Sequence, residues 1–132
     1  MTTYAMDTNI ISYVLRNDEV VINRYRQESS KGNGFAMLSI VYFEVSRWLL
    51  EKNAKKLHME FNEMCRKIPF IDTNKVVWDK AAALYVYTRR SGMPLGGDAD
   101  LLIAAFCLLY DYTLVTNNMR HFKNINVLKL VN

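Results

Sequence analysis

Short apolar segments alternate along this chain with longer segments whose apolar residues recur every three or four positions. The short segments predict buried strands and the longer ones amphipathic helices. Strands that alternate with helices of ten or more residues are typical of βαβ crossovers. We therefore predict an α/β fold with a mainly parallel central sheet and helices on both of its faces. The 132 residues, of which 51% are hydrophobic, fit one domain over residues 1–132.

The positions of these segments give the expected order of elements. Strands are expected at residues 3–6, 35–38, 70–71, 113–115 and 127–131, the last of them at an edge of the sheet. Helices are expected over residues 10–15, 18–30, 40–48, 57–68, 74–91 and 100–110. Ser39 and Asp98 are expected as caps of their helices, because side-chain oxygens of these types accept hydrogen bonds from the first turn.

Composition restricts the compartment and the class of partner. Seventeen Lys and Arg against thirteen Asp and Glu give a net charge of +4, which favours a polyanionic partner. The longest uncharged apolar run, Leu101–Tyr110, is far shorter than the ~18–20 residues that cross a membrane. Cys65 and Cys107 form no CxxC pair, which favours a reducing compartment. We expect a cytoplasmic protein without a membrane segment.

Polar side chains follow several of the predicted strands directly. Asp7 follows the first strand, Ser39 the second, and Asn118 comes three residues after Val115. In open α/β sheets, ligands bind outside the carboxyl ends of the strands. Glu44 lies a little over one turn into the helix after Ser39.

Asp98 and Asp100 stand at the start of a helix, and either one would complete a set of three acids with Asp7 and Glu44. If their sheet edges share one crevice, the three carboxylates repel one another and require a cation. Oxygen ligands without His or Cys suit Mg²⁺ or Mn²⁺, which can activate water against a phosphodiester. Each acid also has a structural interpretation: Asp7 is equally suited to cap a helix, and Asp98, after two glycines, suits a cap better than a ligand.

Four motifs carry a resemblance to a known family. They are Met6–Tyr13, the pair Ser39 and Glu44, Asp100–Ala105, and Leu114–Asn118 followed by His121 and Phe122. Together, and in this order, they resemble PIN-domain ribonucleases, and more narrowly the VapC toxins of type II toxin–antitoxin modules.

The resemblance implies a metal-dependent endoribonuclease that cuts a structured RNA, such as tRNA or rRNA, with Mg²⁺ or Mn²⁺. It implies Asp7, Glu44 and Asp100 as the metal-site acids, Glu44 in part through water, and Asn118 as a fourth catalytic position. It also implies a VapB-type antitoxin and a homodimer. The supporting positions beside the acids are Thr8, Asn9, Ser39, Asp98 and Thr116.

Asn118 departs from the family pattern, because many members carry an acid there. The site then holds a charge of about −3 rather than −4, which favours one firmly bound ion over two. Asp98 cannot compensate from a regular helix, because residues two apart point roughly 200° apart. The candidates for RNA contacts flank the predicted site in sequence and are Arg89, Arg90, Arg120 and Lys123.

Two other functions remain open at this stage. A PIN-like fold whose site has decayed into a binding module is conceivable because of Asn118. A phosphoacceptor signalling domain shares the size and the alternation, but here Asp7 stands alone rather than in an acidic pair. For the antitoxin, candidate apolar surfaces lie around Ile11, Val14 and Leu15 and around Trp48 and Leu49. The alternative is that these residues fill the core, which suits Ile11 and Leu15 better than Trp48.

Overall fold

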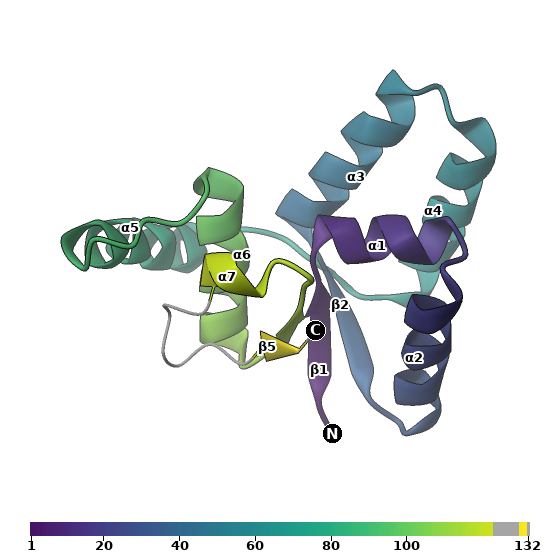
Figure 1. The fold of residues 1–132 in the computed structure, drawn as a ribbon, viewed down its shortest axis with the longest axis horizontal. Helices are drawn as coiled ribbons and strands as arrows, with labels where there is room; N and C mark the ends of the chain where they lie inside the picture. Colours follow the sequence, from purple (N-terminus) through teal and green to yellow (C-terminus); the bar gives the residue numbers. More distant parts are fainter. Residues whose placement is uncertain (123–129, 132) are drawn as a thin grey trace.

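A computed structural model describes residues 1–122 and 130–131 of the chain. Within these residues the chain alternates strands with one or two helices (Figure 1). The elements are β1 (Thr3–Met6), α1 (Thr8–Leu15), α2 (Glu19–Ser30), β2 (Gly34–Leu38), α3 (Ser39–Glu51), α4 (Lys55–Lys67), β3 (Phe70–Ile71), α5 (Lys75–Arg90), α6 (Asp98–Tyr110), β4 (Thr113–Val115), α7 (Met119–Phe122) and β5 (Leu130–Val131).

The strands form one sheet in the order β3-β2-β1-β4-β5, and every neighbouring pair is parallel. β1 is the central strand: Tyr4 lies between Phe35 of β2 and Thr113 of β4. The predicted parallel α/β fold is confirmed, and β5 lies at the expected edge. Residues 127–129 of the predicted last strand lie outside the described residues.

The chain adds strands to the sheet on both sides of β1. It first builds β2 and β3 on one side, then crosses back and adds β4 and β5 on the other. Right-handed crossovers in opposite directions place their helices on opposite faces of the sheet. Figure 1 shows this division, with α1 to α4 on one side of the sheet and α5 to α7 on the other. The strand order reverses between β2 and β4, which is where ligands bind in such folds.

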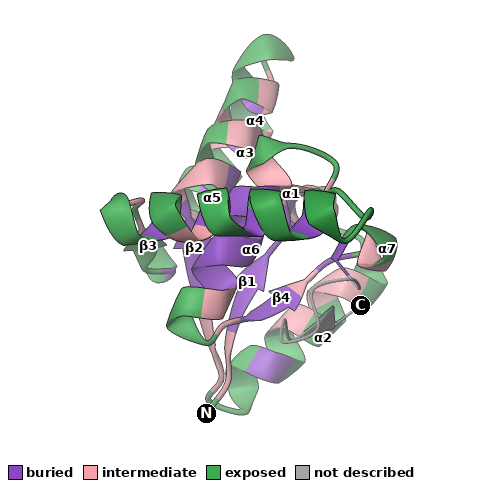
Figure 2. Cartoon of the chain, turned by 90° about the vertical axis from the view of Figure 1, so that its left-hand side faces the viewer, coloured by how far each residue is buried: buried purple, intermediate pink, exposed green. Residues whose placement is uncertain are grey.

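The helix α6 provides most of the core on its side of the sheet. Its residues from Leu101 to Cys107 are all buried (Figure 2), which explains why this segment is the most continuously apolar of the chain. Burial raises the pKa of the Cys107 thiol to about 12, so this cysteine is an inert packing residue. No helix within residues 1–122 and 130–131 combines the length and the apolar character needed to cross a membrane.

The helix starts differ from the expectation at two positions. The cap positions of α3 and α6 are Leu38 and Gly97, so the predictions for Ser39 and Asp98 were one residue too late. Both serve as the first residue of their helix instead. Apolar and glycine residues can occupy a cap because backbone geometry alone begins the helix, and neither cap makes a side-chain hydrogen bond. The one-turn helix α7 was not predicted, because four residues show no period.

A buried acid ties α2 to the central strand. Glu28 is 7% exposed, and its Oε1 accepts a 2.6 Å hydrogen bond from the Tyr4 hydroxyl. Lys31 Nζ lies 3.1 Å from its Oε2. The Tyr4 hydrogen bond, followed by that of Lys31, holds the pKa of Glu28 below its ordinary value. The charged form of Glu28 therefore stabilises the packing of α2 on β1.

This network predicts a specific dependence of stability on pH. Because the folded pKa of Glu28 lies below the unfolded one, its contribution is complete above the unfolded pKa of about 4.3. The contribution is lost as the pH falls further through the folded pKa. We expect Glu28→Gln to lower the urea midpoint at pH 7 and to lose less stability than wild type between pH 5 and pH 3. Parallel pH profiles for the two proteins would contradict this role.

Candidate metal and active site

Asp7 is held at the carboxyl end of the central strand. Its backbone N–H donates to the carbonyl of Val115, at 2.9 Å, which extends the pairing of β1 with β4. Asp7 occupies the N-cap position of α1 but makes no capping hydrogen bond with its side chain. Instead Oδ2 accepts a 2.8 Å hydrogen bond from the hydroxyl of buried Thr116. Asp7 is only 7% exposed, and its carboxylate is thus oriented by Thr116, the residue after β4, rather than used to cap the helix.

Glu44 lies on α3, slightly more than one turn from the end of β2. Its Oε1 accepts a 2.8 Å hydrogen bond from the Thr8 hydroxyl, which follows Asp7 in the chain. Arg47, one turn further along α3, places its guanidinium 3.7 Å from Oε2. Glu44 is therefore a partly buried acid with partners from two helices, consistent with its mostly apolar neighbours.

Asp100 lies in the first turn of α6, on the opposite side of the sheet from α3. Burial raises the pKa of its carboxyl group above the ordinary value, and the negative charge of Asp7 raises it further. His121 acts in the opposite direction, with Nδ1 3.3 Å from Oδ2, and Glu44 adds a smaller increase. Asp100 therefore feels the charges of both Asp7 and Glu44, the latter more weakly.

The other predicted site positions divide into central and peripheral ones. Asn118 lies beside the acids, and its backbone N–H donates to Thr116 Oγ1 at 3.0 Å. By contrast, Asn9 and Asp98 are exposed, and Ser39 begins α3 without a hydrogen bond to any of the three acids.

The chemistry of the acidic cluster suits a hard divalent cation better than a soft one. The donors are carboxylate oxygens, and a buried pair of like charges is stabilised by a cation. Within the described residues, no three His, Cys, Asp or Glu side chains are grouped closely enough to hold one ion together. Mg²⁺ commonly binds through one or two carboxylates and keeps several waters. Asp7 and Asp100, with Glu44 farther out, fit that pattern.

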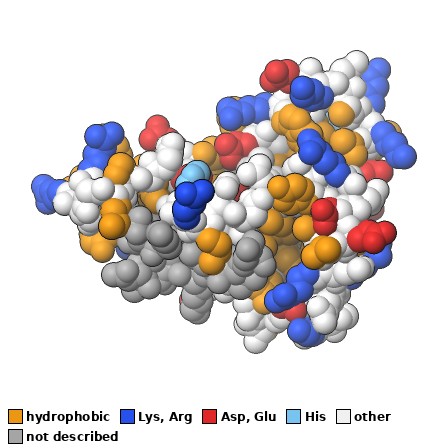
Figure 3. Space-filling view, viewed as in Figure 1, with side chains coloured by type: hydrophobic (Ala, Val, Ile, Leu, Met, Phe, Trp, Pro, Cys, Tyr) orange, Lys and Arg blue, Asp and Glu red, His pale blue; other side chains and the backbone are white. Residues whose placement is uncertain are grey.

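The arginines predicted to contact RNA, Arg89, Arg90 and Arg120, are exposed. Arg89 and Arg90 end α5, and the Arg89 guanidinium lies 4.5 Å from the centre of the Tyr85 ring. Arg120 is exposed on α7, whereas Lys123 lies outside the described residues. The face drawn in Figure 3 carries its Lys and Arg side chains in several separate places rather than in one continuous patch.

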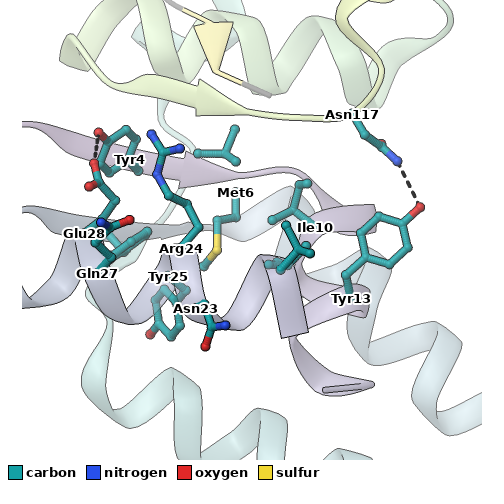
Figure 4. A pocket seen from close by; sticks show the side chains of 14 residues that line it. Tyr4, Met6, Ile10, Tyr13, Asn23, Arg24, Tyr25, Gln27, Glu28 and Asn117 are labelled. Carbon is teal, nitrogen blue, oxygen red and sulfur yellow. Dashed lines mark hydrogen bonds between the residues drawn. The ribbon is translucent and has the colours of Figure 1, made fainter. Parts of the chain in front are cut away.

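A separate pocket of about 660 Å³ lies between β1 and the helices α1 and α2. Its lining is mostly apolar, including Met6, Ile10 and Val20 (Figure 4). At the end near the acids, Asn117 Nδ2 donates to the Tyr13 hydroxyl at 2.9 Å. The pocket therefore begins beside the candidate site and extends along the central strand to Tyr4.

The residues named for an antitoxin groove divide between the core and the surface. Ile11, Leu15 and Leu49 are buried in the core and present no surface to a partner. Helical spacing identifies an apolar face but does not distinguish the part that packs inward from a face left open. Val14 and Trp48 are only partly buried.

Sequence reasoning also missed side chains that contact the acids. His121 belongs to the fourth motif but was given no role, yet it contacts Asp100 across 21 positions of sequence, and Arg47 was not considered. The signal for Arg47 was its spacing of three residues from Glu44 on one helix. No signal in the sequence alone pairs His121 with Asp100, because the contact depends on how α7 packs on α6.

Several known proteins are similar to this chain in sequence and fold. Residues 4–128 match the family described as PIN domain. The chain is 28% identical over 130 residues to Ribonuclease VapC2 of Rickettsia felis, covering 98% of this chain and 96% of that protein. The crystal structure of VapBC2 from Rickettsia felis, bound to a DNA fragment from its promoter, has a TM-score of 0.88 at 27% identity. The match covers 99% of this chain and 98% of that one. DNA-bound VapBC from Salmonella typhimurium has the same fold, with a TM-score of 0.86 at 20% identity and coverages of 99% and 98%.

Proposed function

Because this chain belongs to the PIN domain family, we propose that it is a VapC-type endoribonuclease, the toxin of a toxin–antitoxin pair. The observation that carries the proposal is the arrangement of three acids: Thr116 binds Asp7, Thr8 in the next position binds Glu44, and the charges of both acids act on Asp100. The substrate we propose is a structured RNA, tRNA or rRNA, in the cytoplasm, whose cleavage blocks translation.

We assign Mg²⁺ or Mn²⁺ to Asp7 and Asp100, with Glu44 acting through water. The bound ion would polarise the phosphodiester and lower the pKa of a water molecule. The protein contributes orientation: Thr116 fixes the carboxylate of Asp7, and Thr8 fixes that of Glu44. Asn118 offers an amide oxygen at the same edge without adding charge.

The alternative functions are weaker on this structure. Phosphoacceptor domains of the flavodoxin-like type place their first strand between the second and third. Here β1 lies between β2 and β4, so that alternative does not fit. A PIN-like binding module with a decayed site would have the same fold as an active enzyme, so only the chemistry of the site separates the two. The three acids, with Asp7 and Glu44 both acting on Asp100, argue against the binding module.

Substitution of the acids tests the proposed reaction. We expect Asp7→Asn, Glu44→Gln and Asp100→Asn each to reduce Mn²⁺-dependent RNA cleavage by more than about 100-fold, because each weakens the hold on the ion. Asp98→Asn is the matched control, since Asp98 is exposed on the same turn of α6, and it should cut RNA at close to the wild-type rate. EDTA should stop cleavage. A wild-type protein that cuts no RNA with Mn²⁺ would instead support the binding module.

We further propose that Arg89, Arg90 and Arg120 contact RNA phosphates; Lys123 belongs to the same proposal from sequence alone. In an Asp7→Asn background, where RNA stays intact, Arg89→Gln or Arg120→Gln should reduce the log–log salt slope of RNA binding by about 0.7–1. Arg66→Gln is the control, because Arg66 is exposed on α4 and paired with Glu63. Equal slopes for all these proteins would place the RNA elsewhere.

The partner we propose is a VapB-type antitoxin that blocks this site. A cluster of carboxylates can accept an Arg or Lys of the partner in place of the ion, through charge-assisted hydrogen bonds. The apolar pocket beside Tyr13 and Asn117 offers an anchor for the same peptide. The homodimer remains a prediction of the family resemblance, and no contact face is assigned to it.

A charged residue introduced at this pocket tests whether the pocket anchors the antitoxin. Val20, 80% exposed, lines the pocket, whereas Val76, 58% exposed, lies on α5 across the sheet. We expect Val20→Glu to weaken binding of the antitoxin encoded beside the toxin by at least about 10-fold, and Val76→Glu to leave it unchanged. RNA cleavage should vanish in the wild-type complex. Equal affinities for the two variants would exclude this pocket as the anchor.

A further inference from the structure

We propose that His121 is a positioning residue for Asp100, which it orients so that one carboxylate oxygen remains available to the divalent ion. The inference rests on the proposed function, because it assigns Asp100 to that ion. Its starting observation is the contact between His121 Nδ1 and Asp100 Oδ2, at 3.3 Å. The two residues come from α7 and α6, which are separated in sequence by β4.

A continuous path of hydrogen bonds fixes His121 relative to Asp7. Thr116 Oγ1 donates to Asp7 Oδ2 at 2.8 Å and accepts from the backbone N–H of Asn118 at 3.0 Å. The carbonyl of Asn118 accepts from the backbone N–H of His121, also at 3.0 Å. His121 then reaches Asp100. The two acids assigned to the ion are therefore held at opposite ends of one polar chain.

The backbone that carries His121 is anchored in the core. Phe122, the next residue, is fully buried, and α7 follows β4 after only a few residues. The imidazole is half exposed, with 50% of its side-chain surface accessible. An exposed ion pair contributes little to stability. A role in folding is thus a poor explanation for this contact, whereas control of a carboxylate rotamer needs only a fixed donor.

Gly96 lies next to the Asp100–His121 pair. A Cβ at residue 96 would lie 3.1 Å from Asp100 Oδ2 and 3.5 Å from both Cε1 and Nδ1 of His121. A Cβ contact at 3.1 Å is tighter than nine in ten real ones, so a larger residue would shift the carboxylate by a few tenths of an ångström. The adjacent Gly97 has no atom within 4 Å of its corresponding position. The loop before α6 is therefore fitted to the Asp100–His121 pair at one residue.

His121 is better suited to orient Asp100 than to bind the ion itself. Mg²⁺ strongly prefers oxygen ligands over imidazole nitrogen. The Nδ1 atom of the ring already lies 3.3 Å from Asp100 Oδ2. An N–H donor that fixes one carboxylate oxygen is a common arrangement behind metal-binding side chains, and its loss typically costs 10–100-fold in metal affinity.

The test compares variants that keep or remove a donor at the Nδ1 position. Asparagine places its amide nitrogen near the position of Nδ1, whereas leucine offers no donor. We expect His121→Leu to weaken Mn²⁺ binding, measured by calorimetry without RNA, by about 10-fold or more. His121→Asn should retain affinity close to wild type. The second histidine of the sequence, His58, lies on α4. His58→Leu is therefore the matched control and should not alter Mn²⁺ binding.

A second pair of variants tests the fit of the loop. Gly96→Ala should weaken Mn²⁺ binding because its Cβ meets Asp100, while Gly97→Ala should not. The melting temperatures of all metal-free variants are measured alongside, and unchanged values separate positioning from a folding defect.

The outcomes distinguish this inference from the proposed function. If wild type binds Mn²⁺ and His121→Leu binds it equally well, the positioning role is wrong while the proposed function stands. If His121→Asn is as weak as His121→Leu, the Nδ1 donor is not what matters, and the inference is overturned. A wild-type protein that binds no Mn²⁺ overturns both.

Discussion

A carboxylate buried at the carboxyl end of the central strand is the constraint around which this molecule is organised. Asp7 is only 7% exposed, and the negative charge of Asp7 opposes ionisation of Asp100. Burying such a group is costly unless hydrogen bonds or a cation compensate. The structure supplies one strong hydrogen bond from Thr116, and the remaining charge is what a divalent cation can stabilise. The same cost explains why the acids belong to a site rather than to the core.

The parallel sheet makes this convergence possible. β1 is flanked by β2 and β4, so the segments after three neighbouring strands meet at one edge. Because the crossovers run in opposite directions from β1, Glu44 reaches the edge from one face and Asp100 from the other. Acidic side chains thereby reach this edge from both faces of the sheet. The apolar pocket that Tyr13 and Asn117 line begins beside the same edge.

The sequence allowed much of this to be predicted, for identifiable physical reasons. Strands and long helices follow from periodicity, and Asp7, Glu44 and Asp100 follow from their places after strands or at a helix start. The sequence could not show what depends on packing between distant segments. Examples are the hydrogen bond of Thr8 to Glu44 and the contact of His121 with Asp100. The same limit left groove and core as alternatives for Ile11 and Leu49, because periodicity does not say which apolar face is covered.

The central claim is that Asp7 and Asp100 together bind one divalent ion, with Glu44 beyond it. The most direct measurement is the anomalous scattering of Mn²⁺ in crystals of the wild-type protein, combined with calorimetric stoichiometry in solution. The account predicts a single strong peak in contact with the carboxylates of Asp7 and Asp100 and about one tightly bound ion per chain. Two equally strong peaks, a peak away from these two acids, or no binding at millimolar Mn²⁺ would contradict it.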